Sequence, residues 1–243
     1  RNLTRDNTLR SSFEKSVPPT DSLEVNSTLN EVTLVHATPE GDQAIARALL
    51  SRILGKSLND SGIEDFIKNP ENLKQLYLDT FKVMEPWDSA PREFEFASVT
   101  FEIAISAAAY AQLKRHRMAT MVVGPYQPEL DITVPPALRG NAGEEILRKS
   151  AEDSRHLVEK LMQEHDAIHP YAFLSCHRRR VTVKMNAREL IHLSRLREDQ
   201  HAQWDIREIS SQMLSEARKV LPLSLIPACG KHEFESYREQ LDI

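Results

Sequence analysis

The chain has 243 residues, of which 40% are hydrophobic and 28% are charged, a balance typical of a globular protein with one large domain or two small ones. The net charge of -5 argues against a protein that coats nucleic acid or an anionic membrane through bulk charge. The two cysteines exclude a disulfide framework and indicate a reducing compartment, so we expect a cytoplasmic protein.

Residues 1–30 are polar, contain paired prolines and show no steady period, so we expect a tail or an interdomain linker there. The chain begins with Arg1 and not with methionine. We therefore expect either a fragment of a longer protein with a second domain or an artificially shortened sequence, and both remain open. Residues 31–243 are expected to form the folded domain.

Hydrophobic periodicity predicts strands that alternate with helices along the rest of the chain. The strands are expected at Val32–Val35, Val99–Ile103 and Val181–Met185. The helices are expected after Gly41, at Glu71–Phe81, after a Ser106 cap to near Arg115, at 141–165, at Arg188–Leu196 and at His201–Leu221, where Pro222 ends the last one. This order predicts an α+β (mixed α/β) fold, a single domain in which a mixed sheet packs with long helices.

Two segments carry more detailed expectations. Gly124–Pro136 contains four prolines and is predicted to be a loop. In the helix 141–165, the apolar residues expected to face inward are Ile146, Leu157, Leu161 and Met162.

The first polar cluster lies at the end of the Ala-rich helix, where Arg115, His116 and Arg117 follow one another. Cationic groups there favour the carboxyl end of a helix electrostatically. Arginine also presents planar paired donors to phosphate, so the same run suits an anion clamp. The residues alone are compatible with both interpretations.

The second polar cluster lies where the strand 181–185 gives way to a helix. Its side chains combine amide, guanidinium and imidazole groups, which suits a cofactor with phosphates and ring carbonyls, although a solvated helix face remains the alternative. The cluster comprises Asn186, Arg188, His192, Arg195, Arg197 and His201. Helical spacing predicts that His192 and Arg195 share one side and that Arg197 and His201 form an i,i+4 pair.

Other chemistry is not indicated. The basic run His177–Arg180 is expected to be a solvated loop or strand entry, and we expect no nucleic-acid partner. Cys176, His177 and Cys229 lack the spacing of zinc ligands, so no metal site is expected. No GxGxxG, GxxxxGK[ST] or Gly-x-Ser-x-Gly motif is present, and the longest apolar stretch is too short for a membrane span.

The segment NARELIHLSRLREDQHAQWDIREIS resembles the C-terminal signature of the flavin-dependent thymidylate synthases. Arg115-His116-Arg117 resembles the Arg-His-Arg that opens the defining motif of that family, and Gln112 stands where the family also has glutamine. EFEFASVTFEI is similar to the family's Phe-Glu-His-x-x-Phe-Thr-Phe strand. The resemblance covers roughly residues 31–235 and implies the fold of that family.

By this resemblance, a homotetramer would place FAD at its subunit interfaces. Reduced flavin would help to move a one-carbon unit from methylenetetrahydrofolate onto dUMP, giving dTMP, with NADPH as the reductant. The resemblance assigns the substrate to Gln112 and to Arg197, which is also the expected catalytic cation. The FAD contacts that it implies are Arg115, His116, Arg117, Asn186, Arg188, His192 and His201.

The chain departs from the family where dUMP phosphate is held and where the flavin and folate pocket is lined. The positions that differ are Phe96, Val123, Pro125, Gln127 and Pro170. We therefore expect this domain alone to be weak or inactive in dUMP methylation. The alternatives are a non-catalytic assembly domain of a tandem synthase and a methyltransferase that acts on another nucleotide. A nucleic-acid module built on the arginines is disfavoured by the retained flavin residues.

Overall fold

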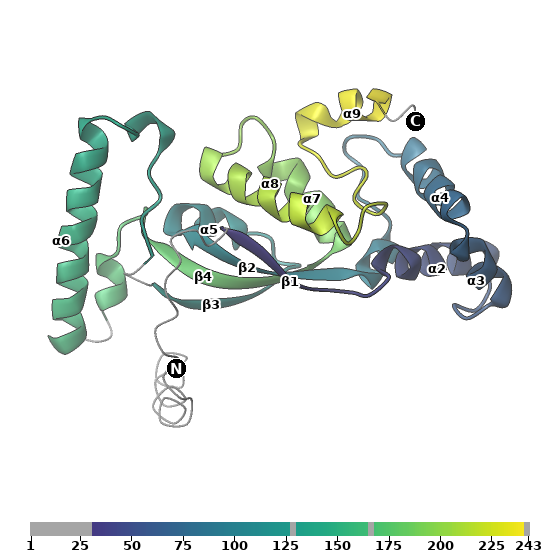
Figure 1. The fold of residues 1–243 in the computed structure, drawn as a ribbon, viewed down its shortest axis with the longest axis horizontal. Coiled ribbons are helices and arrows are strands. Elements are labelled where there is room, and N and C mark those ends of the chain that lie inside the picture. Colours follow the sequence, from purple (N-terminus) through teal and green to yellow (C-terminus); the bar gives the residue numbers. More distant parts are fainter. Residues whose placement is uncertain (1–30, 127–129, 165–167, 241–243) are drawn as a thin grey trace. The chain divides into compact units, whose positions relative to one another are not determined.

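The structure is a computed structural model that describes residues 31–126, 130–164 and 168–240 (Figure 1). The expected tail 1–30 and Gln127 lie outside the described residues. The chain divides into two compact units. The smaller unit contains Tyr126–His177, and the larger unit contains Glu31–Pro125 with Arg178–Ile243. The class is α+β, as the order of predicted elements indicated.

A four-stranded sheet organises the larger unit. Its strands are β1 (Val32–Ala37), β2 (Ser98–Ser106), β3 (Thr120–Tyr126) and β4 (Arg178–Asn186), in the order β1-β2-β4-β3. The β1–β2 and β2–β4 pairs are both antiparallel. The residues of β2 alternate between the core and the opposite face, as expected for a central strand.

The strand β3 corrects the predicted loop over Gly124–Pro136. Its last three residues, from Gly124 to Tyr126, belong to that segment. β3 lies at the edge of the sheet, where a proline costs no ladder hydrogen bond, and Pro125 is exposed there. The guanidinium of Arg179 donates to the Gly124 carbonyl at 2.7 and 3.0 Å. The predicted loop is therefore wrong at Gly124–Tyr126, which end an edge strand, and is confirmed at residues 131–135, which belong to no helix or strand.

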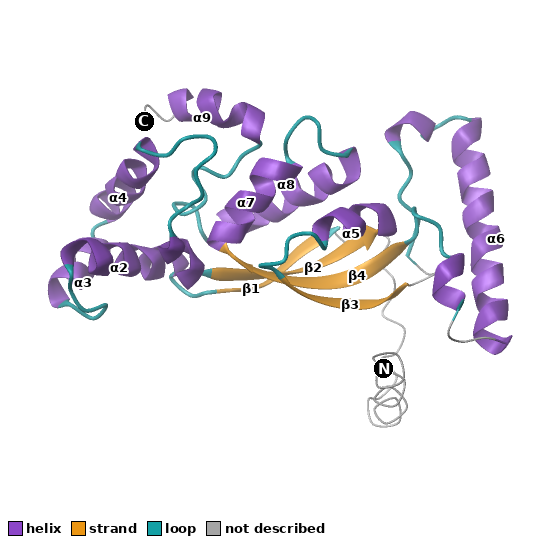
Figure 2. Cartoon of the chain, turned by 180° about the vertical axis from the view of Figure 1, so that it is seen from behind, coloured by secondary structure: helices purple, strands orange, loops and turns teal. Residues whose placement is uncertain are grey.

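Helices α5 (Ala107–Leu113), α7 (Ala187–Arg197) and α8 (Trp204–Arg218) lie over one face of the sheet (Figure 2). α5 and α7 each begin directly after a strand. The Ser106 hydroxyl accepts from the Ala109 amide at 3.0 Å, and the Asn186 side chain accepts from the Glu189 amide at 2.8 Å. These N-caps fix the points at which the two helices start.

The remaining helices of the larger unit are α2 (Gly41–Leu54), α3 (Ser61–Lys68), α4 (Pro70–Lys82) and α9 (Phe234–Gln240). The sequence predicted α2 and α4 but neither α3 nor α9. A 3-10 helix, η1 (Arg92–Phe96), leads into β2, so Phe96 precedes the strand. The core contains the fully buried rings of Tyr77, Phe81, Phe94 and Phe101.

The smaller unit is built on α6 (Ala142–Glu164), which confirms the predicted helix. Its predicted inward face is wrong, because Ile146, Leu157 and Met162 are exposed. The buried residues of α6 are instead Ala151, Ser154 and Val158, and the Ser154 hydroxyl donates to the Ala172 carbonyl at 2.6 Å. Over the part of the chain that is described, no helix combines the length and apolar character that a bilayer span requires.

The core position of Phe101 gives a direct stability prediction. We expect Phe101→Ala to lower the free energy of unfolding by about 3–5 kcal/mol, because the ring is fully buried in the central strand β2. Phe66→Ala is the matched control, since that ring is 36% exposed on α3 and should lose much less. Urea unfolding measures both. Equal losses for the two variants would contradict the described core.

Candidate functional site

The turn that follows α5 separates the three side chains of the Arg-His-Arg run. The helix ends at Leu113, and the Arg115 and His116 amides donate to the Gln112 and Leu113 carbonyls at 3.2 and 3.0 Å. His116 faces inward and is only 4% exposed, whereas Arg115 and Arg117 are exposed. The histidine therefore belongs to the protein interior and the two arginines are directed to solvent.

His116 is held between two residues of α7. Its Nδ1 lies 3.0 Å from the Oε1 of Glu189, a carboxylate that is itself only 7% exposed. The Nε of Arg197 donates to the Nε2 of His116 at 3.1 Å. One imidazole thus connects the first turn of α7 with its last residue.

A second contact orients the Arg197 guanidinium. The Arg197 guanidinium also donates to the Gln112 carbonyl at 3.4 Å, and the Gln112 side chain donates to the Oε1 of Gln203 at 2.9 Å. Burial lowers the pKa of Arg197, and the positive charge of Arg115 lowers it further. The positive charges of Arg115 and Arg197 thus lie in the same region of the structure.

His192 adds an imidazole to this cluster. Its ring lies 5.8 Å from that of His116 in an edge-to-face arrangement. Burial lowers the pKa of His192 and the nearby charge of Glu189 raises it, while the guanidinium groups of Arg195 and Arg197 add to the lowering. The structure therefore brings together five predicted site residues, namely Gln112, Arg115, His116, His192 and Arg197.

The other predicted residues have local structural partners. Asn186 caps α7. The Arg188 guanidinium donates to the Ala90 carbonyl at 2.7 Å and to Glu95 at 3.1 Å, so it ties α7 to η1. Arg195 is buried, donates to the Asp88 carbonyl and lies over the Phe234 ring.

His201 corrects one expectation about α7. The helix ends at Arg197, and α8 begins only at Trp204, so Arg197 and His201 do not form an i,i+4 pair within one helix. The Asp199 side chain accepts from the His201 amide at 2.9 Å, and the Ala202 amide donates to the Asp199 carbonyl at 2.9 Å. This Asx-type turn breaks the helical run and leaves the His201 side chain exposed.

The positions that depart from the family are distributed over both units. Val123 and Pro125 lie in β3, and Pro170 lies in η3 (His169–Ala172) of the smaller unit. Phe96 is 55% exposed in η1, where it lines an open hollow of about 500 Å³ together with Arg92, Glu93 and Glu95. Because η1 is tied to Arg188, this hollow lies beside the start of α7.

Two residues of the site were missed by the sequence interpretation. Gln203, the N-cap residue of α8, gives no local signal. Glu189 stands three residues after the Asn186 cap, a spacing that suggests a side chain reaching back to the cap backbone. In the structure that carboxylate is directed to His116 instead. The sequence shows a carboxylate at Glu189, but its burial depends on the turn after α5, which is distant in the chain.

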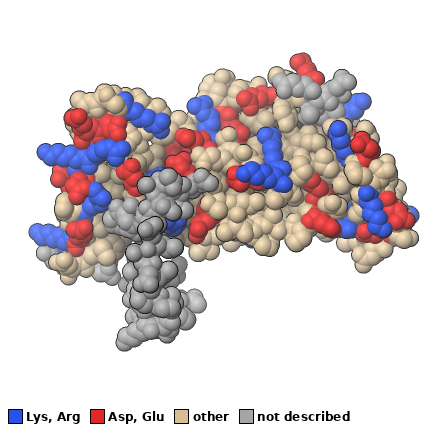
Figure 3. Space-filling view, in the orientation of Figure 1, with Lys and Arg blue, Asp and Glu red and all other residues tan. Residues whose placement is uncertain are grey.

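Charge is spread over the visible surface rather than gathered. In Figure 3, basic and acidic side chains are interspersed on the face shown, with no continuous basic area. This face therefore offers no broad basic area for a phosphate. Among the described residues, no group of three or more His, Cys, Asp or Glu could hold a metal ion.

Comparison with known proteins identifies the class of this arrangement. The family model described as thymidylate synthase complementing protein matches residues 33–223. The flavin-dependent thymidylate synthase of Sulfolobus acidocaldarius is 34% identical over 139 residues, which cover 53% of this chain and 52% of that protein. The flavin-dependent thymidylate synthase of Saccharolobus solfataricus is 30% identical over 208 residues, covering 79% and 74%.

A solved structure has the same fold. The UMP/dUMP methylase PolB from Streptomyces cacaoi, bound with 5-Br dUMP, aligns with a TM-score of 0.65 and 18% identity, covering 82% of this chain and 95% of that chain. Together these findings show that the chain belongs to the flavin-dependent thymidylate synthase family. The matched region spans about half the length of the relatives from Sulfolobus acidocaldarius, Thermococcus kodakarensis and Sulfurisphaera tokodaii.

The end of α7 gives a prediction about pH. Glu198 directly follows Arg197, and burial raises its pKa to about 7, while a hydrogen bond from Ser210 and the charge of Arg218 oppose the rise and Glu233 adds to it. The folded state thus binds this proton more tightly than the unfolded chain. The resulting stability is present below about pH 4.5 and is lost as the pH rises towards 7.

We therefore expect urea unfolding to show a larger loss of stability between pH 5 and pH 8 in the wild type than in Glu198→Gln. The difference should be on the order of 1–3 kcal/mol. Histidines titrate in both proteins, so their contribution cancels in the comparison. Parallel pH profiles for the two proteins would show that Glu198 titrates normally.

Proposed function

We propose that this chain binds FAD and acts as a flavin-dependent thymidylate synthase-like protein with a modified acceptor site. The observation that carries the proposal is the cluster after α5, where exposed Arg115 and Arg117 flank an inward His116 that fixes Arg197. This arrangement supplies solvent-facing guanidinium groups for phosphates beside one oriented cation. The two cysteines of the chain agree with a cytoplasmic location.

The residues present fit the flavin cofactor. Guanidinium groups pair with phosphate oxygens through two parallel hydrogen bonds, so Arg115 and Arg117 suit the pyrophosphate of FAD. Asn186, Arg188, His192 and His201 are proposed as further FAD contacts along α7, from its cap at Asn186 to the turn that follows Arg197. When bound and reduced, the flavin would supply the hydride for the transferred one-carbon unit, with methylenetetrahydrofolate and NADPH as co-substrates.

Arg197 is proposed as the catalytic cation and, with Gln112, as a contact of the nucleotide. A guanidinium that is already held by His116 and by the Gln112 carbonyl needs no reorganisation when negative charge develops on a pyrimidine ring. Its partial burial reduces screening by water, which strengthens this stabilisation. The chain offers no activated nucleophile in the cluster, so the proposed role is electrostatic.

FAD binding is the first test of the proposal. We expect the purified protein to show a flavin spectrum or to be reconstituted by added FAD. The double variant Arg115→Ala/Arg117→Ala should bind FAD at least about tenfold more weakly, because it loses charged hydrogen bonds. These two are preferred to Arg188→Ala, since Arg188 also ties α7 to η1.

Lys74→Ala is the control for this titration, because it removes another exposed cation, on α4. It should bind FAD like the wild type. Failure of the wild type to bind FAD, alone or with any partner domain, would refute the proposal.

The acceptor site is proposed to disfavour dUMP. Pro125 has no side-chain donor and no amide hydrogen, and Val123 offers no polar group. Each lost hydrogen bond to a charged phosphate costs about 1.5–3 kcal/mol, so two or three losses weaken binding by roughly 10³-fold or more. The relatedness in fold to a UMP/dUMP methylase makes UMP the alternative nucleotide to test.

We therefore expect little tritium release from 5-tritiated dUMP by this chain with FAD, methylenetetrahydrofolate and NADPH. The same assay with labelled UMP separates a changed substrate from a non-catalytic assembly domain of a tandem synthase. Absence of tritium release from both nucleotides supports the assembly role. Rapid release from dUMP would show that the substituted positions are not needed.

Self-association completes the proposal, either as a homo-oligomer or with a homologous tandem domain. On α6, Ile146 and Leu157 are exposed and lie eleven positions apart, about three helical turns, so they share one side. The apolar face of α8, by contrast, is buried in its own unit. α6 is therefore the better candidate for an interface between copies.

Light scattering tests this assembly. The wild-type chain should form a homo-oligomer, and Ile146→Glu/Leu157→Glu should shift it towards the monomer, because two charges would be buried at the contact. Glu159→Lys, at an exposed position on another side of α6, is the control and should keep the wild-type mass. A wild type that stays monomeric at high concentration, from a parent without a homologous domain, would rule out the interface.

A further inference from the structure

We propose that Glu189 is the positioning residue for Arg197, and that it acts through His116 by fixing the tautomer of that imidazole. This inference rests on the proposed function of Arg197 as the cation beside flavin and nucleotide. It concerns a carboxylate to which neither the sequence pattern nor the family resemblance assigned a role. Its basis is a chain of two hydrogen bonds, from Glu189 to His116 and from His116 to Arg197.

The tautomer follows from the donors that surround His116. A guanidinium nitrogen can only donate, so the Nε2 that receives the Arg197 Nε–H at 3.1 Å carries no proton. The single proton of the neutral ring is then on Nδ1, which donates to the Glu189 carboxylate at 3.0 Å. A proton on Nε2 would place two donors against each other. Glu189 thus keeps Nε2 available as an acceptor.

Glu189 cannot position Arg197 directly. The two residues lie eight positions apart on α7, about 12 Å along the helix axis. His116, which lies in the turn after α5, bridges this separation. The Glu189 carboxylate holds the Nδ1–H of His116, so the Nε2 of this ring is a fixed acceptor for the Nε–H of Arg197. The Gln112 carbonyl then receives a second guanidinium nitrogen at 3.4 Å. Two contacts on different nitrogens define the plane of the guanidinium.

Burial makes this chain of contacts sensitive to the charge of Glu189. His116 and Glu189 are 4% and 7% exposed, so water does not replace a lost partner. A buried carboxylate also compensates part of the positive charge of Arg197, which is itself partly buried. Replacing the carboxylate with an amide of the same shape removes both effects while the packing is kept.

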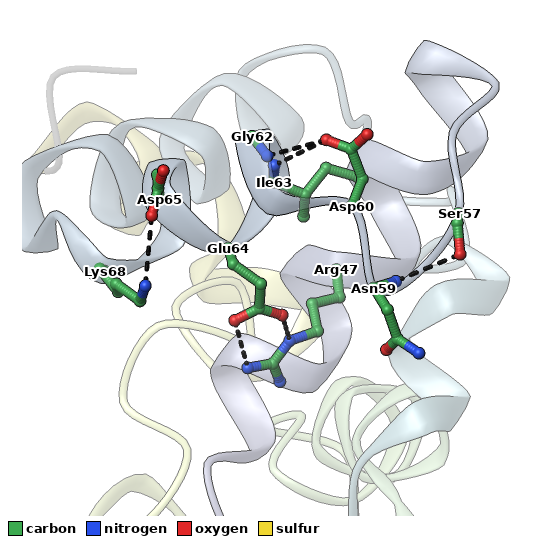
Figure 4. A network of polar contacts seen from close by, with 9 residues as sticks. All are labelled: Arg47, Ser57, Asn59, Asp60, Gly62, Ile63, Glu64, Asp65 and Lys68. Carbon is green, nitrogen blue, oxygen red and sulfur yellow. Dashed lines mark hydrogen bonds and ion pairs between the residues drawn. The ribbon is translucent and has the colours of Figure 1, made fainter.

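The test compares Glu189→Gln with a matched control, Glu64→Gln. Glu64 also bonds a residue of another helix of the same unit, since the Arg47 guanidinium donates to it from α2 with a contact at 3.2 Å (Figure 4). This control removes an ion pair between helices without touching the site. The cost of losing a carboxylate contact between two elements should therefore appear in both variants, although the Glu64 side chain is 32% exposed and that of Glu189 is 8% exposed.

Two readouts separate positioning from mere structural support. The first is the tautomer of His116, read from ¹⁵N NMR of labelled histidine and assigned with a His116→Asn variant. A glutamine can either accept from Nδ1–H or donate to Nδ1. If Glu189 is what holds the Nδ1–H form, its loss allows a second form with the proton on Nε2 and Arg197 turned away, so Glu189→Gln should give a mixture of tautomers. The wild type and Glu64→Gln should show the Nδ1–H form alone.

The second readout is the affinity for FAD and for 5-bromo-dUMP, measured for Glu189→Gln, Arg197→Lys and the double variant. Glu189→Gln should lower by about tenfold the affinity for whichever ligand Arg197→Lys binds more weakly. Adding Glu189→Gln to Arg197→Lys should lower that affinity by less than about a further twofold, because both substitutions remove the same interaction. Glu64→Gln should leave both affinities unchanged.

Three results would overturn the inference. These are a pure Nδ1–H tautomer in Glu189→Gln, fully additive losses in the double variant, and equal losses in Glu189→Gln and Glu64→Gln. If neither the wild type nor any of the variants binds flavin or nucleotide, the proposed function fails. The comparison of the His116 tautomers alone then decides the role of Glu189. If Glu189→Gln does not fold, a proton on Nε2 of His116 in the wild type contradicts the inference.

Discussion

The buried hydrogen bond between His116 and Glu189 is the interaction on which the site depends. A carboxylate and an imidazole removed from water must satisfy each other, because each would otherwise carry a large desolvation cost. Their contact joins the turn after α5 to the first turn of α7. It thereby directs Arg115 and Arg117 to solvent and presents an acceptor to Arg197. The chemistry proposed for the chain uses groups that this one contact sets in place.

The sequence predicted the regular elements where periodicity and capping agreed. Ser106 was expected to cap the helix after β2, and the structure confirms it. The predictions were wrong where contacts between distant parts of the chain determine the local structure. Prolines predicted a loop over Gly124–Pro136, yet an edge strand tolerates Pro125. Ile146 and Leu157 were expected to face inward, yet the stripe of α6 that packs within its unit contains Ala151 and Val158. Of the four large apolar residues predicted to face inward, only Leu161 is half-buried, and Ile146, Leu157 and Met162 are exposed.

For the candidate site, the residue types and spacings were sufficient to find the cluster but not its internal roles. Arg188 and Asn186 were assigned to flavin by resemblance, and both have structural contacts in this chain, to η1 and to the α7 backbone. Glu189 was overlooked because a glutamate in the first turn of a helix is ordinary. Its importance depends on His116, 73 positions away in the chain, which local spacing does not reveal.

We propose that this member of the flavin-dependent thymidylate synthase family keeps a cation cluster for the flavin beside an altered nucleotide pocket. The central claim is that FAD binds beside the α5 turn and the end of α7. A crystal structure of the chain grown with FAD tests this most directly. The account predicts flavin density against Arg115, Arg117 and Arg197, with His116 still bonded to Glu189. Density for FAD at another surface, or a His116 side chain turned out of its contact with Glu189, would contradict it.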